Sequence, residues 1–222
     1  MMFTIDKSIS TAYPGTKMGI LVMKEVSCPG SYEEWDTAEF LDELQHRYGH
    51  FNRQELKERN PINTYVAYYK KFGQSYHLLA QLESVLKGKK SLNTKSGVLR
   101  AMFFSELESM LLTAGHDLSK LRLPLQLKIA TGTEVYQSIC GKEVTTVNGD
   151  MMLCDSSSTI SSILRGPDYN SRITSATMEF LFSIYAPPFV DGNYIKVNLE
   201  KLEKRIGAFA PFSRTELLQV FS

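Results

Sequence analysis

The sequence has few cysteines, a single tryptophan and no excess of charge of either sign. Its 222 residues include 3 Cys and 1 Trp, and 25 Lys and Arg stand against 24 Asp and Glu. Three widely spaced cysteines without a Cys-x-x-Cys pair exclude a disulfide framework and a cysteine-based zinc site. A net charge of +1 means that the field of the whole protein is weak, so any anion site must come from local clustering.

Long hydrophobic runs are also absent. The longest, 19–23 and 180–186, are much shorter than the ~20 residues of a membrane-spanning helix. Asp6 interrupts the N-terminal stretch before a signal-peptide core could form. We therefore expect a cytoplasmic protein that does not contact membranes. Motifs of P-loop, dinucleotide-binding, α/β-hydrolase and zinc-protease sites are missing as well, and we expect neither a metal nor a cofactor.

The hydrophobic pattern changes its period along the chain. A short apolar run at 18–24 predicts a buried strand. Apolar residues then recur every three to four positions, which predicts a series of helices. These helices are expected at 32–48, from Pro61 onward, at 76–86 and at about 95–113, where Ala114 and Gly115 would end the last one.

After residue 120 the period shortens to two. Leu125, Leu127 and Ile129 alternate with polar residues, and evenly spaced turn signals up to residue 164 predict several short strands. The tail predicts a helix at 194–206 and, after a capping-box pattern at 213–216, a further helix. We infer a single α+β domain over 1–222. Its expected parts are a small β-barrel or sandwich core mainly at 121–187, a helical layer at 32–113, and C-terminal helices.

The segment from residue 70 to residue 100 is strongly basic. It holds seven basic residues and one acid, Glu83, for a local net charge of +6. Tyrosines precede it, and basic side chains beside exposed aromatic rings suit RNA with unstacked bases. A solvated lysine surface above core-facing tyrosines is the alternative. The residues predicted to contact RNA are Lys70, Lys71, Lys87, Lys89, Lys90 and Lys95.

Two polar clusters are candidates for substrate binding. The loop 164–174 carries Arg165, Asp168 and Arg172, which could bind a carboxylate, a ribose or a phosphate. The pair His116 and Asp117 could position a water or a substrate. Each cluster also has a purely structural interpretation: Asp168 could brace its turn through an arginine, and Asp117 could cap a short turn.

Several motifs together resemble a known module. Their order is Gly-His-Asp-Leu-Ser-Lys-Leu, a strand, Gly-Lys-Glu, Gly-Asp, Arg-Gly-Pro-Asp and Tyr-Ala-Pro-Pro, at 115–121, 126–130, 141–143, 149–150, 165–174 and 185–188. This order resembles the tRNA-binding and editing B3/B4 domain of the phenylalanyl-tRNA synthetase beta chain, and more closely the free-standing proteins made of that module. Stretches at 60–72 and 86–89 also fit the N-terminal half of those proteins.

The resemblance implies an RNA-binding protein, with tRNA as the partner through residues 70–100. It also implies a possible aminoacyl-tRNA deacylase, which would cleave the ester of a misacylated tRNA with a positioned water. The family's phenol-reading glutamate would fall at 182–185, where Ser183 and Tyr185 are the side chains able to hydrogen-bond a substrate. No synthetase activity is expected. The alternative is a non-catalytic module that binds a free amino acid or nucleotide in the same pocket.

Overall fold

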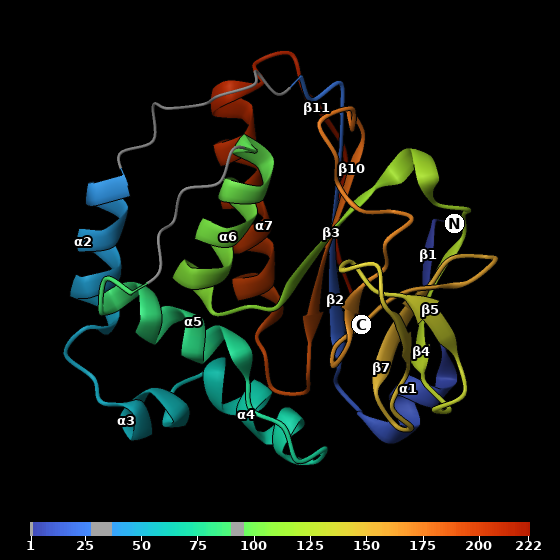
Figure 1. Cartoon of the computed structure of the whole chain (residues 1–222), viewed down its shortest axis with the longest axis horizontal. Helices are drawn as coiled ribbons and strands as arrows, with labels where there is room; N and C mark the ends of the chain where they lie inside the picture. The colour runs from blue at the N-terminus through green and yellow to red at the C-terminus, as the bar shows by residue number, and fades with distance from the viewer. Residues whose placement is uncertain (1, 28–36, 90–95) are drawn as a thin grey trace.

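Two β-sheets lie face to face, and a layer of helices covers the outer face of one of them (Figure 1). The structure is a computed structural model that describes residues 2–27, 37–89 and 96–222. The strands of the four-stranded sheet, in spatial order, are β11 (Arg214–Phe221), β2 (Lys17–Lys24), β10 (Phe180–Ala186) and β3 (Thr113–Asp117). The strands of the five-stranded sheet are β1 (Phe3–Ile5), β4 (Leu125–Ile129), β7 (Met151–Cys154), β8 (Thr159–Ser162) and β9 (Gly166–Pro167).

The helices precede and follow these strands in the chain. They are α1 (Lys7–Ala12), α2 (Thr37–Tyr48), α3 (Arg53–Glu58), α4 (Ile62–Lys70), α5 (His77–Leu86), α6 (Gly97–Ser109) and α7 (Gly192–Phe209), with a 3-10 turn at Leu118–Lys120. A small hairpin of β5 (Val135–Gln137) and β6 (Glu143–Thr145) forms a separate two-stranded sheet. It is joined to the five-stranded sheet where Ile139 N–H donates to the Pro167 carbonyl at 3.0 Å. Among the described helices, none is both long and apolar enough to cross a bilayer.

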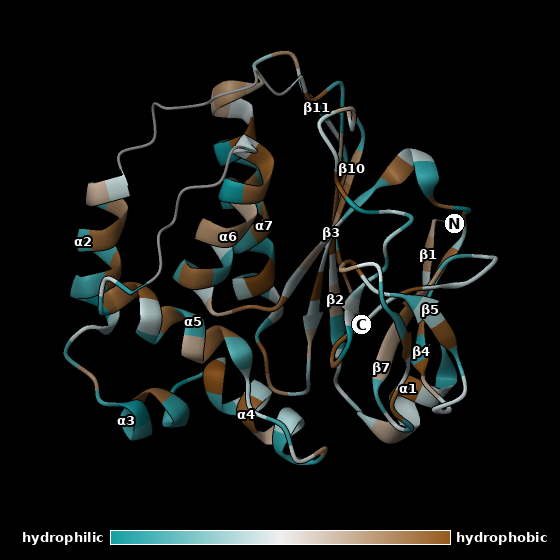
Figure 2. Cartoon of the chain, in the orientation of Figure 1, coloured by the Kyte–Doolittle hydropathy of each residue, from teal (hydrophilic) through white to brown (hydrophobic). Residues whose placement is uncertain are grey.

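The core lies on both faces of the four-stranded sheet. Strand β10 is buried at every position, because helices cover one of its faces and the five-stranded sheet covers the other. A Cβ on Gly19 of β2 would lie 2.6 Å from Ile195 Cγ2, so α7 packs directly on the strand backbone. Figure 2 shows hydrophobic residues on the central strands and on α6 and α7, whereas α3 is largely hydrophilic.

The edges of the two sheets meet at two places. At one, the rings of Phe3 in β1 and Phe221 in β11 lie 4.7 Å apart between centroids. At the other, β3 contacts β9. In the described part of the chain the sheets do not close into a barrel. The contact between β3 and β9 is called the seam below.

The α+β class and most elements agree with the sequence prediction. The expected helices at 76–86 and 194–206 correspond to α5 and α7, and the expected strands at 18–24 and 125–129 correspond to β2 and β4. The sheets draw on more of the chain than 121–187, because β2 and β11 belong to the four-stranded sheet. The predicted helix at 32–48 begins in residues outside the described part, and Thr37–Tyr48 forms α2.

One predicted helix end and one predicted helix are strands. Met110, in the left-handed conformation, ends α6, and Thr113–Asp117 then pairs with β10, so Ala114 and Gly115 lie within a strand rather than at a helix end. The prediction of a helix after residue 213 is also wrong. Arg214–Phe221 forms β11, which pairs with β2 and has a bulge between Thr215 and Leu217. In both cases pairing with a distant strand overrides the local pattern.

Candidate functional site

A cavity of about 410 Å³ opens at the seam and is called the seam cavity below. Strand β3 contributes Thr113, Ala114 and Gly115, and the end of β8 and β9 contribute 162–167. Helix α6 covers it with Leu99, Met102 and Glu106, which share one face of that helix at positions i, i+3 and i+7. Its volume lies within the range of about 300–1,000 Å³ that is usual for small-molecule sites.

The walls of the seam cavity are mainly apolar. Leu99 and Met102 of α6 are half-buried in this wall, and Ile139 reaches it from the β5–β6 hairpin. Ile163, which precedes β9 in the chain, and Ile173, which follows it, complete the apolar lining. Apolar walls favour a ligand that has an apolar body of its own, because its burial removes apolar surface from water.

A few polar groups converge on the same cavity. Glu106 is buried, and its Oε1 accepts the Thr113 backbone N–H at 3.0 Å. Arg165 is exposed at the rim, and its Nε donates to the Thr145 carbonyl at 3.1 Å. Tyr185 is buried, shares a hydrogen bond with the Ser161 hydroxyl, and has a pKa raised by burial. The cavity therefore offers a carboxyl group, a guanidinium and a neutral phenol.

The outer edge of β3 adds backbone groups. Thr113 N–H donates outward to Glu106, and Asp117 N–H donates outward to the Ser171 carbonyl at 2.7 Å. Alternate residues of a strand direct their N–H and C=O to the same edge, so those of Gly115 also face the seam. A Cβ on Gly115 would lie 2.8 Å from Ile173 Cδ1 and 3.0 Å from Met102 Sδ. Glycine here lets the side chains of Ile173 and Met102 pack directly against the strand backbone.

His116 and Asp168, both predicted to bind substrate, belong to a buried network beside the cavity. His116 Nδ1 lies 2.6 Å from Ser171 Oγ, and Ser171 Oγ donates to Asp168 Oδ1. Burial lowers the pKa of His116 to about 4, although the Asp168 carboxylate lies 3.8 Å from Nδ1, and burial raises the pKa of Asp168. The imidazole is therefore neutral near pH 7, and this network joins β3 to the loop after β9.

Asp117 and Arg172, also predicted to bind substrate, make internal contacts, and Asp168 makes further ones. Asp117 caps the 3-10 turn by accepting the Ser119 N–H at 3.0 Å, and it accepts the Thr177 hydroxyl at 2.9 Å. Arg172 stacks 3.6 Å above the Tyr169 ring centroid and donates to the Tyr169 carbonyl. Asp168 accepts the N–H groups of Asn170 and Ser171, so it braces its own turn without an arginine.

Ser183 lies within the core. Its side chain is fully buried in β10, and its hydroxyl has no hydrogen-bond partner among the described residues. Of the seven predicted substrate-binding residues, Arg165 and Tyr185 line the seam cavity, whereas His116, Asp117, Asp168, Arg172 and Ser183 do not.

The predicted RNA-binding lysines differ from the tyrosines that precede them. Lys70, Lys71, Lys87 and Lys89 are exposed, while Lys90 and Lys95 lie outside the described residues. The tyrosines of α4 and its neighbourhood are buried and donate to internal acceptors, for example Tyr68 to Asp150 Oδ1 at 2.6 Å. They cannot stack on bases, so only the charged part of the predicted RNA surface is accessible.

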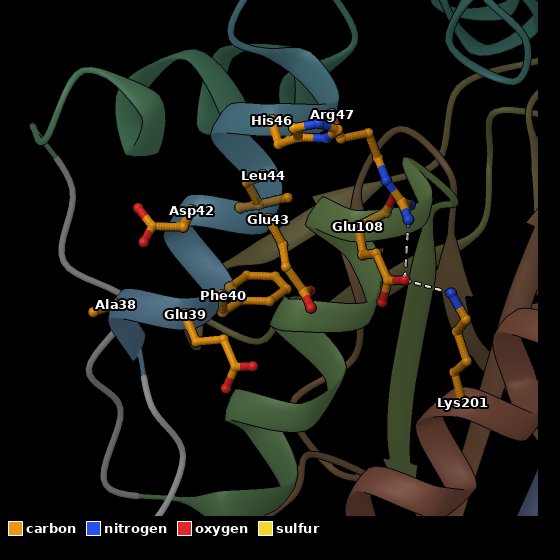
Figure 3. A pocket seen from close by; sticks show the side chains of 10 residues that line it. All are labelled: Ala38, Glu39, Phe40, Asp42, Glu43, Leu44, His46, Arg47, Glu108 and Lys201. Atoms are coloured by element: carbon orange, nitrogen blue, oxygen red, sulfur yellow. Dashed lines mark hydrogen bonds and ion pairs between the residues drawn. The ribbon is translucent and has the colours of Figure 1, made fainter.

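A larger hollow of about 880 Å³ lies beside α2 (Figure 3). Most of its lining comes from α2, and the opposite wall consists of Glu108 from α6 and Lys201 from α7. Glu108 pairs with Arg47, Lys201 and Arg205, and although burial raises its pKa, these partners hold it below its usual range. The Glu108 carboxylate in this hollow is thus neutralised by basic side chains of the protein itself. We therefore regard the smaller seam cavity as the candidate site.

The sequence prediction did not identify the α6 wall or His77, which lies at the entrance of the seam cavity. Leu99 and Met102 lie in the segment where apolar spacing predicted a helix, and no local signal separates a core position from a cavity wall. Across the described ranges, no three His, Cys, Asp or Glu side chains are grouped so that they could hold a metal ion.

Comparisons with known proteins detect a similarity in structure but none in sequence. No protein-family profile matches the chain, and no curated protein matches its sequence. Among solved structures, it is similar to an N-terminal fragment of the phenylalanyl-tRNA synthetase beta-subunit from Pyrococcus horikoshii. The identity is 11%, the TM-score is 0.48, and the match covers 97% of this chain and 54% of that one. The chain thus spans about half the length of that fragment.

Proposed function

We propose that the protein is a binding module for an amino acid with an apolar side chain, which it holds in the seam cavity. One observation carries this proposal: a largely apolar cavity contains a buried carboxylate, Glu106, and a guanidinium, Arg165. A zwitterionic amino acid has the complementary groups. Its ammonium suits Glu106, its carboxylate suits the forked donors of Arg165, and its side chain suits the walls formed by Leu99 and Met102.

The outer edge of β3 supports the same assignment. The N–H and C=O of Gly115 can pair with the carboxylate and ammonium of the ligand, as main-chain groups do when an extended peptide joins a sheet edge. Neutral His116 and the buried Asp168 hold β3 against the loop after β9, which keeps both sides of the cavity in place.

The test measures how two single variants change the affinity for amino acids and for analogues that lack either the ammonium or the carboxylate. Binding of L-phenylalanine, L-leucine and L-methionine is measured by calorimetry. Glu106→Gln keeps an acceptor for the Thr113 N–H and is expected to weaken amino-acid binding about tenfold, because one charge-assisted hydrogen bond is lost. It should leave binding of the matching deaminated acid unchanged.

Arg165→Gln gives the complementary result. It is expected to weaken binding of the amino acid about tenfold and to leave binding of the amino-acid amide, which has no carboxylate, unchanged. If both variants weaken every ligand equally, or if no amino acid binds the unaltered protein, the proposal is wrong.

A second candidate is that the amino acid is attached to RNA, which would make the protein an RNA-binding module and a possible aminoacyl-tRNA deacylase. The exposed lysines Lys70, Lys71, Lys87 and Lys89 favour it, because they can neutralise phosphates of the RNA backbone. His77, at the cavity entrance and 3.3 Å from the Tyr69 hydroxyl through Nδ1, is the group placed to activate a water for ester cleavage.

A double substitution tests the RNA candidate. Lys87→Glu with Lys89→Glu is expected to weaken tRNA binding. It should also make the negative slope of log K against log salt shallower by roughly 1 to 2, because fewer phosphates are neutralised. Lys120→Glu with Lys142→Glu, at exposed lysines elsewhere, is the matched control. Equal affinity and slope for both doubles and the unaltered chain would contradict this candidate. Multiple-turnover hydrolysis of tyrosyl-tRNA(Phe) is the readout for the deacylase.

A further inference from the structure

Three short helices surround a third cavity, of about 180 Å³, called the helical cavity below. Helix α3 contributes Arg53 and Lys57, which are four residues apart and therefore share one face. Helix α4 contributes Val66 and Lys70 with the same spacing. The start of α5 and the residues just before it, 74–76 and Leu79, complete the wall. Figure 1 shows α3, α4 and α5 together at the bottom of the helical layer.

The helical cavity is lined by three cationic side chains and no acidic ones. Arg53 pairs with Glu83 nearby. Lys57 and Lys70 form no ion pair with any residue in the described ranges. The acids of α3 are engaged elsewhere: Glu55 accepts the Asn52 N–H at 2.7 Å, and Glu58 accepts the Gln54 side-chain amide at 2.9 Å.

Two ammonium groups that line one small cavity repel each other, and a bound anion would turn that repulsion into attraction. A tetrahedral phosphoryl group has enough acceptor oxygens to bind both lysines together with the polar side chains of Gln74 and Ser75, which also line the wall. The volume suits a single phosphoryl group rather than a whole nucleotide. We propose that the helical cavity is a binding site for a phosphoryl group.

This site is independent of the amino-acid proposal, because the residues that would hold the anion do not line the seam cavity. The two cavities are nevertheless neighbours: Tyr76 lines the helical cavity, and the next residue, His77, lines the seam cavity. A phosphorylated molecule held by Lys57 and Lys70 would therefore lie near the seam-cavity entrance. The phosphoryl group could come from a nucleic-acid backbone or from a free phosphorylated metabolite.

The test is a titration of the full, isotope-labelled chain with inorganic phosphate at constant ionic strength, without amino acid. Saturable shifts of the Gln74 and Ser75 backbone amides are expected in the unaltered protein. Lys57→Gln with Lys70→Gln should lower the apparent affinity at least about tenfold. Lys57→Arg with Lys70→Arg should retain binding, and Lys89→Gln, at an exposed lysine outside the cavity, should change nothing.

Shifts that grow linearly without saturation, or that are the same in the glutamine double variant, would overturn the proposal. The arginine double variant shows whether any loss comes from charge rather than from misfolding. Two further arms identify the source of the phosphoryl group. If a single-stranded oligonucleotide displaces phosphate at a lower concentration than a mononucleotide does, the source is a nucleic acid. If the two displace phosphate equally well at the same total concentration of phosphate groups, the source is a free metabolite.

Discussion

Leu99→Trp is expected to abolish amino-acid binding, with a loss of about 100-fold or more in affinity, equivalent to ~2.7 kcal/mol. Leu99 is half-buried on α6 and lines the seam cavity one turn before Met102. An indole placed there would occupy the space that the apolar side chain of the ligand needs. Since the position is partly open to solvent, the larger side chain should cost the folded state little.

The control for this variant is Val197→Trp. Val197 is also a partly exposed apolar residue on a helix, but it belongs to α7 and does not line the cavity. The Val197→Trp variant should bind the amino acid with the affinity of the unaltered protein, as measured by the same calorimetric titration. Retention of full affinity in Leu99→Trp would show that the ligand binds somewhere else on the molecule.

The stability of the protein is expected to fall by ~3 kcal/mol between pH 6.5 and pH 4 because of His116. Burial lowers the pKa of this imidazole from 6.5 to about 4, so the unfolded chain takes up its proton first. The stabilising contribution is complete above pH 6.5 and is lost as the pH falls toward 4. Asp168, whose pKa burial raises, acts in the opposite direction.

Comparison with His116→Asn isolates the histidine from these other groups. Asparagine can still hydrogen-bond Ser171 from the position of Nδ1 but does not titrate. The free energy of unfolding is measured by urea titration at several pH values, with the exposed His46→Asn as control. The difference between unaltered protein and His116→Asn should shrink as the pH falls from 6.5 to 4. A constant difference would mean that folding does not change the pKa of His116.

Those parts of the fold that follow from local pattern could be predicted from the sequence. Helices α5 and α7 have apolar residues at helical spacing, and β4 alternates strictly, so each shows its own period. Strands β3 and β11 show no such signal. Ala-Gly looked like a helix end at β3, and a capping-box pattern preceded β11. Both segments become strands because β10 and β2 offer them hydrogen bonds across more than 60 residues of chain.

The candidate site was predictable only in part, for a related reason. Arg165 was predicted as one of the hydrogen-bonding side chains in the loop around the Gly-Pro turn. Tyr185 was predicted from the position of the phenol-reading glutamate in the family that the sequence resembles. Their common location depends on the meeting of β9 with β3, which no local pattern encodes. His116 and Asp117 were predicted to position a water or a substrate because they follow an apparent helix end. As parts of β3 they are buried, and their polarity serves internal hydrogen bonds.

The central claim is that an amino acid binds in the seam cavity, and a backbone-amide chemical-shift titration of the full chain with L-phenylalanine, L-leucine and L-methionine tests it most directly. We predict saturable shifts at Met102, Gly115 and Gly166, which border the cavity from α6, β3 and β9. Residues Ala38 and Asp42, at the larger hollow beside α2, should not move. Shifts centred on α2, or none with any of the three ligands, would contradict the account.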